Sequence, residues 1–488
     1  MGKLTTIFKD TAIYGLSSII GRFLNYLLVP LYTAQLSAAS GGYGIITNIY
    51  AYVALVLVLL TFGMETTYFR FTNKTHTDSQ TVYGTTLITV GSLSLVFAAL
   101  VLLFLSPVSQ LMGYGEHPDY VGVMAVTVAI DAFLCIPFAH LRQEKKAVKF
   151  AALKLLNIVV SIVLNVIYFH YMDGKDVGYA FYINLVCTVM LAVCLVTEYT
   201  GFRWKLDRKL LRSMLSYSWP ILILGLAGIL NQTADKMLFP YIYKDSDMLT
   251  QLGIYGACSK IAMIMAMITQ AFRFAYEPIV FAGVKDKDQH EMYAKAMKYF
   301  IISTLLAFLI VVGYMDVLKR VVVPNHDYWV GLKVVPIVMA AEIMMGIYFN
   351  LSFWYKVIDK TIWGAIFSGI GCAVLLVVNV VFVPRYGYMA CAWGGFAGYG
   401  VAMLMSYIVG QKYYPINYPL KEIALYVVLA LVLYGLMYVA SDWPTLLSLA
   451  FNTLLLVVFA AVIVKRDMPL ENLPFIGHYF RRPKYKVH

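Results

Sequence analysis

Fourteen apolar segments follow one another along the 488 residues of this chain, each long enough to cross a membrane as a helix. A membrane helix needs about 20 apolar residues, because the hydrocarbon core is about 30 Å thick and each residue advances the helix by about 1.5 Å. The links between the segments are short, so we expect no extramembrane domain between them. The segments lie at residues 10–36, 43–71, 83–105, 119–141, 150–172, 177–199, 214–242, 252–282, 297–315, 329–354, 362–383, 387–410, 421–440 and 444–464.

The composition agrees with a polytopic all-α membrane protein. Hydrophobic residues make up 61% of the chain and charged residues only 13%, whereas a soluble protein carries about 25% charged residues. The net charge of +12 could suggest a nucleic-acid partner. Most of the Lys and Arg, however, lie in alternate loops and in the C-terminal tail, as is typical of membrane topology. We therefore expect membrane lipids, and no nucleic acid, as partners.

The same loops predict the orientation of the chain. The basic loops 142–149 and 201–213 and the tail 465–488 all fall on one side, together with the N-terminus. Because cytoplasmic loops carry the excess of Lys and Arg, both termini are predicted to face the cytoplasm, which requires an even number of spans.

A repeated pattern divides the chain into two halves. The stretch from Gly41 to Phe71, GGYGIITNIYAYVALVLVLLTFGMETTYFRF, returns in GIYGACSKIAMIMAMITQAFRFAYEPIVF, which begins at Gly253. Both copies open with Gly-x-Tyr-Gly and carry a carboxylate inside the apolar run, Glu65 in the first and Glu277 in the second. Such internal repeats are typical of transporters.

This repeat predicts the domain organisation. We expect two pseudo-symmetric six-helix lobes, followed by two additional C-terminal helices. The predicted units are an N-lobe at 1–200, a cytoplasmic linker at 201–213, a C-lobe at 214–412, spans thirteen and fourteen at 413–464, and a basic cytoplasmic tail at 465–488.

Basic side chains lie deep inside several of these segments, where a charge costs several kcal/mol unless it faces water or a partner. If the lobes are related by a two-fold axis along the membrane normal, spans one, two, seven and eight form an inner wall. A cavity lined by cations there would suit an anion, and guanidinium matches phosphate through paired donors. The alternative is that each cation merely neutralises a carboxylate, for example Arg273 with Glu277. The candidate binding residues are Arg22, Asn25, Lys236, Lys260 and Arg273.

Acidic residues inside the spans are candidates for coupling transport to an ion or proton. Buried carboxylates often have raised pKa values and can carry protons, but they can equally hold two helices together. Glu65 could be such a structural lock, with Arg70 as its partner. The candidate residues are Glu65, Asp131, Asp235, Glu277 and Glu342.

Three stretches resemble a known family, the Wzx-type flippases among the polysaccharide transporters. They are the first copy of the repeat, the stretch NVVFVPRYGYMACAWGGFAGYG at 379–400, and the cytoplasmic link PFAHLRQEKKAVKF at 137–150. The resemblance implies the fold of the multidrug/oligosaccharidyl-lipid/polysaccharide exporter superfamily, with two lobes in a V and alternating access.

The same resemblance implies a function. We expect a flippase of a bacterial inner membrane that translocates a polyprenyl-diphosphate-linked oligosaccharide, of the O-antigen or capsule repeat-unit type. The polysaccharide polymerase machinery is an expected partner. No catalytic residue, metal or cofactor is expected.

Two other functions remain open. A multidrug or cation antiporter of the same fold would favour a cavity lined by carboxylates, whereas the deep charges here are mostly basic. A membrane-embedded oligosaccharide polymerase or ligase would need a catalytic extramembrane loop, and the outer loops are short.

Overall fold

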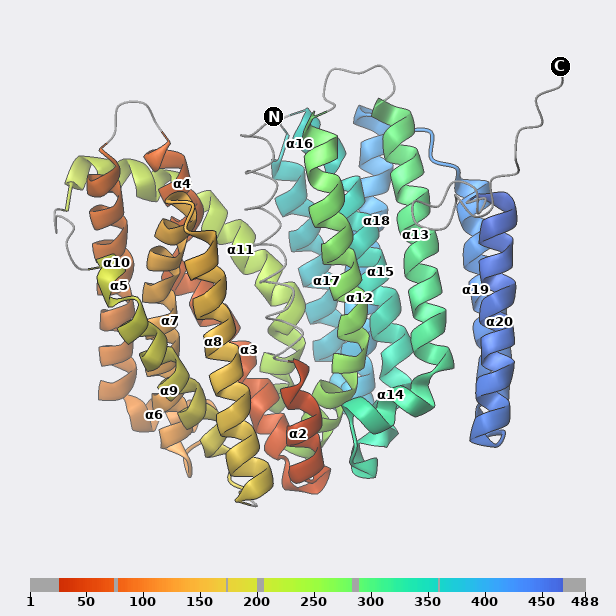
Figure 1. The fold of residues 1–488 in the computed structure, drawn as a ribbon, viewed down its shortest axis with the longest axis horizontal. Coiled ribbons are helices and arrows are strands. Elements are labelled where there is room, and N and C mark those ends of the chain that lie inside the picture. Colours follow the sequence, from red (N-terminus) through yellow and green to blue (C-terminus); the bar gives the residue numbers. More distant parts are fainter. Residues whose placement is uncertain are drawn as a thin grey trace, which may run out of the picture.

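The computed structural model describes residues 26–73, 78–172, 174–199, 206–282, 289–358 and 360–467, except for the side chains at 274, 275 and 277–282. These residues form helices and connecting loops, with no strand among them. Figure 1 shows two helical bundles side by side, with a final helix pair at one edge.

The first bundle contains the helices up to α10, and α11 follows them and crosses from this bundle to the second one. Their bounds are α2 (Leu28–Gln35), η1 (Ala38–Ser40), α3 (Gly42–Thr61), α4 (Met64–Thr72), α5 (Ser79–Leu103), α6 (Leu105–Leu111), α7 (Pro118–Gln143), α8 (Ala147–Val166), η2 (Ile167–Tyr171), α9 (Gly178–Cys194), α10 (Val196–Tyr199) and α11 (Arg208–Ile242). Helix α11 runs obliquely from this bundle towards the second one (Figure 1).

The second bundle and the edge pair complete the fold. Their bounds are α12 (Met248–Ala282), α13 (Gln289–Gly313), α14 (Met315–Val322), η3 (His326–Val334), α15 (Val335–Leu351), α16 (Phe353–Val357), α17 (Ile362–Tyr386), α18 (Tyr388–Tyr413), α19 (Leu420–Val439), η4 (Ala440–Asp442) and α20 (Thr445–Arg466).

Twelve helices in the described ranges are long and apolar enough to cross a membrane. They correspond to predicted spans two to five and seven to fourteen, so the all-α polytopic fold is confirmed. The predicted sixth span is shorter than expected, because α9 has 17 residues and ends at Cys194 before the separate helix α10. The first predicted span lies mostly outside the described residues, and only its end is described, as α2.

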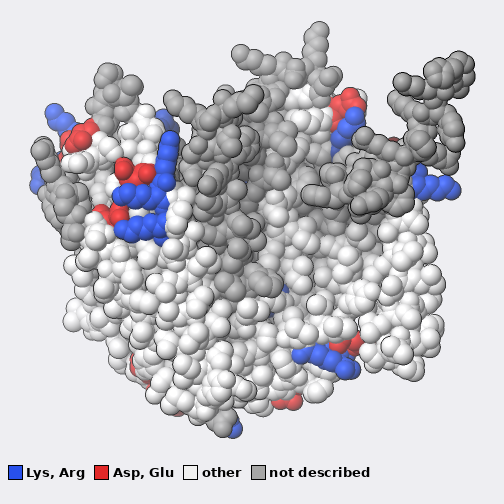
Figure 2. All heavy atoms as spheres, viewed as in Figure 1, with Lys and Arg blue, Asp and Glu red and all other residues white. Residues whose placement is uncertain are grey.

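The charges agree with a membrane-embedded zone. On the face seen in Figure 2, charged side chains gather near the two ends of the molecule, and apart from one small basic spot the described surface between them is uncharged. At the basic end, Lys149 and Lys146 contact Glu198 at 2.6 and 3.7 Å. Burial acts to raise the pKa of the Glu198 carboxyl, but the two lysines outweigh it and the pKa is lowered.

The helix formed by the first copy of the repeat is interrupted between α3 and α4. Helix α3 ends where Phe62 and Gly63 both adopt the left-handed conformation, with φ of 50° and 65°. Because glycine adopts this conformation without steric cost, Gly63 allows α4 to start again in a new direction. The side chain of Ile221 lies 2.9 Å from where a Cβ on Gly63 would be, so the site also tolerates no larger residue.

The two copies of the repeat meet each other where α3 and α12 begin. A Cβ on Gly44 would overlap the backbone carbonyl oxygen of Leu249, and a Cβ on Gly253 would lie 2.9 Å from the Gly44 nitrogen. The Gly-x-Tyr-Gly motifs therefore let the two helices cross with their backbones almost in contact. Nearby, the Tyr328 hydroxyl donates to the Leu36 carbonyl at 2.8 Å. These contacts join the two bundles at the end opposite the basic loops.

The edge pair is attached by one charged junction. Lys298 of α13 forms ion pairs with Glu422 of α19 and with Asp467, which follows α20. The Tyr426 hydroxyl also donates to Asp467. Burial acts to raise the pKa of Asp467, but hydrogen bonds from Lys298 and Tyr426 outweigh it and lower the pKa. This junction adds to the packing of both extra helices on α13, where the rings of Phe308 and Tyr434 lie 5.5 Å apart and Asn452 donates to the Gly313 carbonyl at 2.9 Å.

Candidate functional site

A cavity of about 570 Å³ lies between the two bundles. Its lining comes from α2, α3, α8 and α9 on one side, and from α11, α12, α15, α17 and α18 on the other. On α3 and α12, the lining residues belong to the first half of each helix, next to the Gly-x-Tyr-Gly crossing. The cavity therefore adjoins the end of the molecule where the bundles are joined.

Four ionisable lysines and carboxylates line this cavity among the described residues: Asp235, Lys236, Lys260 and Glu342. The sequence expectation of a wall made mainly of cations is thus corrected for this part of the chain, because two acids balance two lysines. Arg22 and Asn25, which were expected to line the same cavity, lie outside the described residues.

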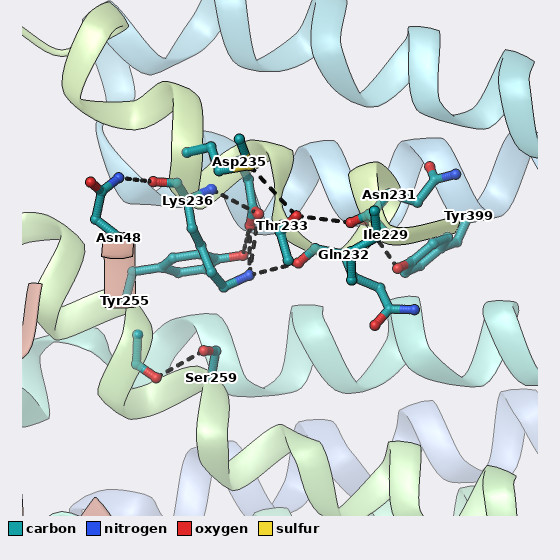
Figure 3. A network of polar contacts seen from close by, with 12 residues as sticks. Asn48, Ile229, Asn231, Gln232, Thr233, Asp235, Lys236, Tyr255, Ser259 and Tyr399 are labelled. Atoms are coloured by element: carbon teal, nitrogen blue, oxygen red, sulfur yellow. Dashed lines mark hydrogen bonds and ion pairs between the residues drawn. The ribbon is translucent and has the colours of Figure 1, made fainter. Parts of the chain in front are cut away.

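Lys236 and Asp235 form a network with Tyr255, the tyrosine of the second Gly-x-Tyr-Gly motif (Figure 3). The Lys236 Nζ lies 3.2 Å from both Asp235 carboxylate oxygens, and it donates to the Gln232 carbonyl at 3.1 Å. The Tyr255 hydroxyl donates to Asp235 Oδ2 at 2.7 Å. Across the bundle boundary, Asn48 Nδ2 donates to the Lys236 carbonyl at 2.8 Å. The network neutralises Asp235 and links α11 to both α3 and α12.

Lys260 and Glu342 differ from this pair. Both are half-buried and line the cavity, and neither side chain forms an ion pair or hydrogen bond within the described ranges. A charge in a low-dielectric site is costly without a partner, so each is suited to bind a group of opposite charge. Lys260 can bind an anion, and Glu342 can bind a cation or a proton.

Arg273 does not share the wall of Lys260, which corrects the expectation that both line one cavity. It is exposed and lines a small separate pocket of about 10 Å³ with Thr269, Asn350 and Lys356. Its guanidinium carbon lies 5.2 Å from the Phe349 ring centre. Thirteen helical residues advance α12 by about 20 Å and turn it by about 220° beyond whole turns, so the two side chains differ in both depth and face.

Two of the predicted coupling acids lie inside the first bundle. Asp131 of α7 accepts a hydrogen bond from Thr188 of α9 at 3.0 Å, and it does not line the cavity. Glu65 forms an ion pair with Arg142 and accepts from the Cys135 thiol at 3.1 Å. The expected partner of Glu65, Arg70, instead lies 4.0 Å above the Tyr217 ring. The side chain of Glu277 lies outside the described part of α12.

Sequence reasoning missed several polar cavity residues. Asn184 and Tyr399 line the cavity, and Tyr255 completes the Asp235 network. Tyr255 could have been found, because it is the tyrosine of the second Gly-x-Tyr-Gly motif. The asparagine had no such signal, since an isolated amide in an apolar helix is compatible with many roles. Within the described ranges, no cluster of His, Cys, Asp and Glu could hold a metal ion.

The structure resembles solved membrane transporters over most of its length. A lipid II flippase, MurJ in an inward closed conformation, matches with a TM-score of 0.73 at 12% identity, over 92% of this chain and 98% of that one. A multidrug resistance transporter of the MATE family, of the MOP superfamily, matches with a TM-score of 0.64 at 15% identity, over 82% and 94%. These identities support a shared fold.

Sequence comparisons agree with the fold. A protein of the Lsg locus of Haemophilus influenzae is 20% identical over 297 residues, which cover 58% of this chain and 67% of that protein. The family described as polysaccharide biosynthesis protein matches residues 39–324, more than half of the chain. The resemblance to the Wzx-type polysaccharide transporters is confirmed, and this multi-pass membrane protein belongs to the polysaccharide biosynthesis protein family.

Proposed function

We propose that this protein is a flippase that carries a polyprenyl-diphosphate-linked oligosaccharide across a bacterial inner membrane by alternating access. The observation that carries the proposal is Lys260, a half-buried cation without an ion-pair partner in the described ranges, in a cavity between two bundles. Ammonium and guanidinium groups bind phosphate oxygens through charge-assisted hydrogen bonds. The cavity volume of about 570 Å³ suits a head group with its first sugars.

Each predicted binding residue has a role in this proposal. Lys260 and Lys236 hold the diphosphate within the cavity, together with Arg22 and Asn25 from the first span. Arg273, in its separate pocket nearer the basic end, contacts the head group at an earlier stage. The prenyl chain stays in the lipid, and the 201–213 linker joins the two moving lobes.

The orientation and the coupling belong to the same proposal. The basic loops and both termini face the cytoplasm, and the polysaccharide polymerase machinery receives the flipped product. Glu342 and Asp235 are the coupling candidates inside the cavity, and Glu277 stays a coupling candidate whose side chain is not described. Asp131 and Glu65 act within the helix packing of the first lobe.

A proteoliposome assay tests this function. The protein is reconstituted with a labelled polyprenyl-diphosphate oligosaccharide, and transfer to the opposite leaflet is measured. Lys260→Ala should slow transfer by about tenfold or more, because a hydrogen bond to a charged group contributes about 1.5–3 kcal/mol. Lys260→Arg should restore most of the rate. Lys295→Ala is the matched control, because Lys295 forms an exposed ion pair with Glu291 outside the cavity.

A second candidate function is a cation antiporter, favoured by the carboxylate of Glu342 in the cavity. The same vesicles distinguish the two proposals. Cationic dye uptake that depends on Glu342, with no transfer of the lipid-linked sugar, would contradict the flippase proposal.

A further inference from the structure

The two sides of the cavity differ in chemistry. All four of its described lysines and carboxylates come from α11, α12 and α15. The opposite wall, formed by α2, α3, α8 and α9, has no lysine, arginine or carboxylate among its described lining residues. Its polar groups are neutral: Tyr32, Tyr43, Thr47, Tyr50, Ser161, Asn165 and Asn184.

Neutral hydroxyl, phenol and amide groups suit a particular kind of ligand. Asparagine both donates and accepts hydrogen bonds, and tyrosine combines an apolar ring with a polar hydroxyl. Uncharged sugar rings present the matching surfaces, namely hydroxyls around an edge and apolar C–H groups on a face. A phosphate or carboxylate would gain little from this wall, because desolvating an anion is costly without a cation beside it.

Part of this wall is already satisfied within the protein. The Tyr32 hydroxyl donates to Asn165 Oδ1 at 2.7 Å, and Asn165 Nδ2 donates to the Ser161 carbonyl at 2.8 Å. The ring of Tyr32 also packs edge-on against the buried Phe169 at 5.2 Å. These residues are therefore fixed parts of the wall rather than its adaptable contacts.

Tyr50 and Asn184 are better placed to meet a ligand. Tyr50 is 36% exposed, although its ring packs at 6.1 Å against the fully buried Phe181. Phe181 is held in turn by Tyr120 at 5.4 Å. Asn184, on α9, is half-buried and lines the cavity together with Tyr50. The ring is thus supported from behind while part of its surface remains available to the cavity.

We propose that the wall formed by α2, α3, α8 and α9 is a glycan subsite, in which an uncharged sugar ring stacks on Tyr50 and is hydrogen-bonded by Asn184. This inference rests on the proposed flippase function and adds a division of labour to it. Lys236 and Lys260 of the α11, α12 and α15 side bind the anionic diphosphate, together with Arg22 and Asn25, and the described residues of the opposite side bind the neutral sugar next to it. The cavity would then select for both parts of its substrate at once.

Two lipid probes separate the subsites. One is a polyprenyl diphosphate that carries a neutral N-acetylhexosamine disaccharide, and the other is the same polyprenyl diphosphate without sugar. Transfer of each is measured in proteoliposomes that contain equal amounts of folded protein. Tyr50→Leu removes the ring, Tyr50→Phe keeps it, and Asn184→Leu removes the amide. Tyr171→Leu changes an exposed tyrosine of the same lobe outside the cavity and is the matched control.

The expected result is selective. Tyr50→Leu and Asn184→Leu should slow transfer of the glycan probe by about two- to tenfold, the range for one aromatic contact or hydrogen bond, and leave the sugar-free probe unchanged. Tyr50→Phe should retain the stacking part of the effect. Lys260→Ala should slow both probes. If Tyr50→Leu does not fold, Asn184→Leu carries the same comparison.

The outcomes that overturn each proposal differ. If the wild-type protein transfers neither probe, the flippase function itself is contradicted. If the wild type transfers the glycan probe but the two Leu variants slow both probes equally, or slow neither, the flippase function stands and the glycan subsite is refuted.

Discussion

The close crossing of α3 and α12 makes a sharp prediction about the movement of the two bundles. Gly44→Ala would place a methyl group against the backbone carbonyl of Leu249. Because the obstacle is backbone, no side-chain rotation relieves the overlap and the helices must separate. Overpacking of this kind typically costs about 1–3 kcal/mol. A cost of about 1.4 kcal/mol is a tenfold change in an equilibrium, so the joined state should lose population by about 5- to 150-fold relative to a state in which this end is open.

Spin-label distances measure this shift directly. Labels on Ala39→Cys and Ser246→Cys, both exposed at this end and lining one surface hollow, report the separation of the bundles after the six native cysteines have been replaced. The short-distance population should fall in Gly44→Ala. Gly228→Ala is the matched control, because nothing lies within 4 Å of a Cβ on that helical glycine. An unchanged distance distribution in Gly44→Ala would refute the idea that the repeated glycines hold this end closed.

Two further predictions concern stability in detergent. Asp467 has a lowered pKa, so its ionised form stabilises the fold above its ordinary pKa of 3.8, and this stabilisation is lost as the pH falls through the lower pKa of the folded state. Asp467→Asn should therefore reduce the melting temperature at pH 7, and the difference in melting temperature from the wild type should disappear below pH 3.8. A difference independent of pH would contradict the ion pair with Lys298. The side chains of Glu65 and Arg142 are about one-third exposed, so water weakens their ion pair. A double-mutant cycle with Glu65→Gln and Arg142→Met should therefore give a coupling free energy of only about 0.5–1 kcal/mol in thermal unfolding. Zero coupling would mean that the pair does not hold α4 to α7.

Much of the fold could be predicted because the membrane imposes a length and a polarity on each helix. Long apolar runs located twelve spans, and the Gly-x-Tyr-Gly repeat identified the two helices that cross between the bundles. The repeat alone did not reveal that its two copies contact each other, since internal symmetry fixes the relation of two helices but not their distance. The sequence also did not predict the helix break at Phe62 and Gly63 or the short length of α9, because both depend on local backbone conformation rather than hydrophobicity.

The site was harder to predict for physical reasons. Arg273 was expected to line the same cavity as Lys260 at a different depth, but the rotation of α12 over 13 residues carries it to another face and another pocket. The true partner of Glu65, Arg142, is 77 positions away in sequence, beyond the reach of any local pattern. Lys236 and Lys260 lay on helices expected to form the inner wall, and Asp235 and Glu342 were named as candidate acids. Only the structure shows that all four line one cavity.

The most direct test of the account is chemical analysis of the lipid-linked sugars in cells that lack this protein. If the protein is the flippase, a polyprenyl-diphosphate oligosaccharide should accumulate on the inner leaflet, and the wild-type gene should clear it while the Lys260→Ala gene should not. A lipid-linked sugar pool that is unchanged by the loss of the gene would contradict the proposed function.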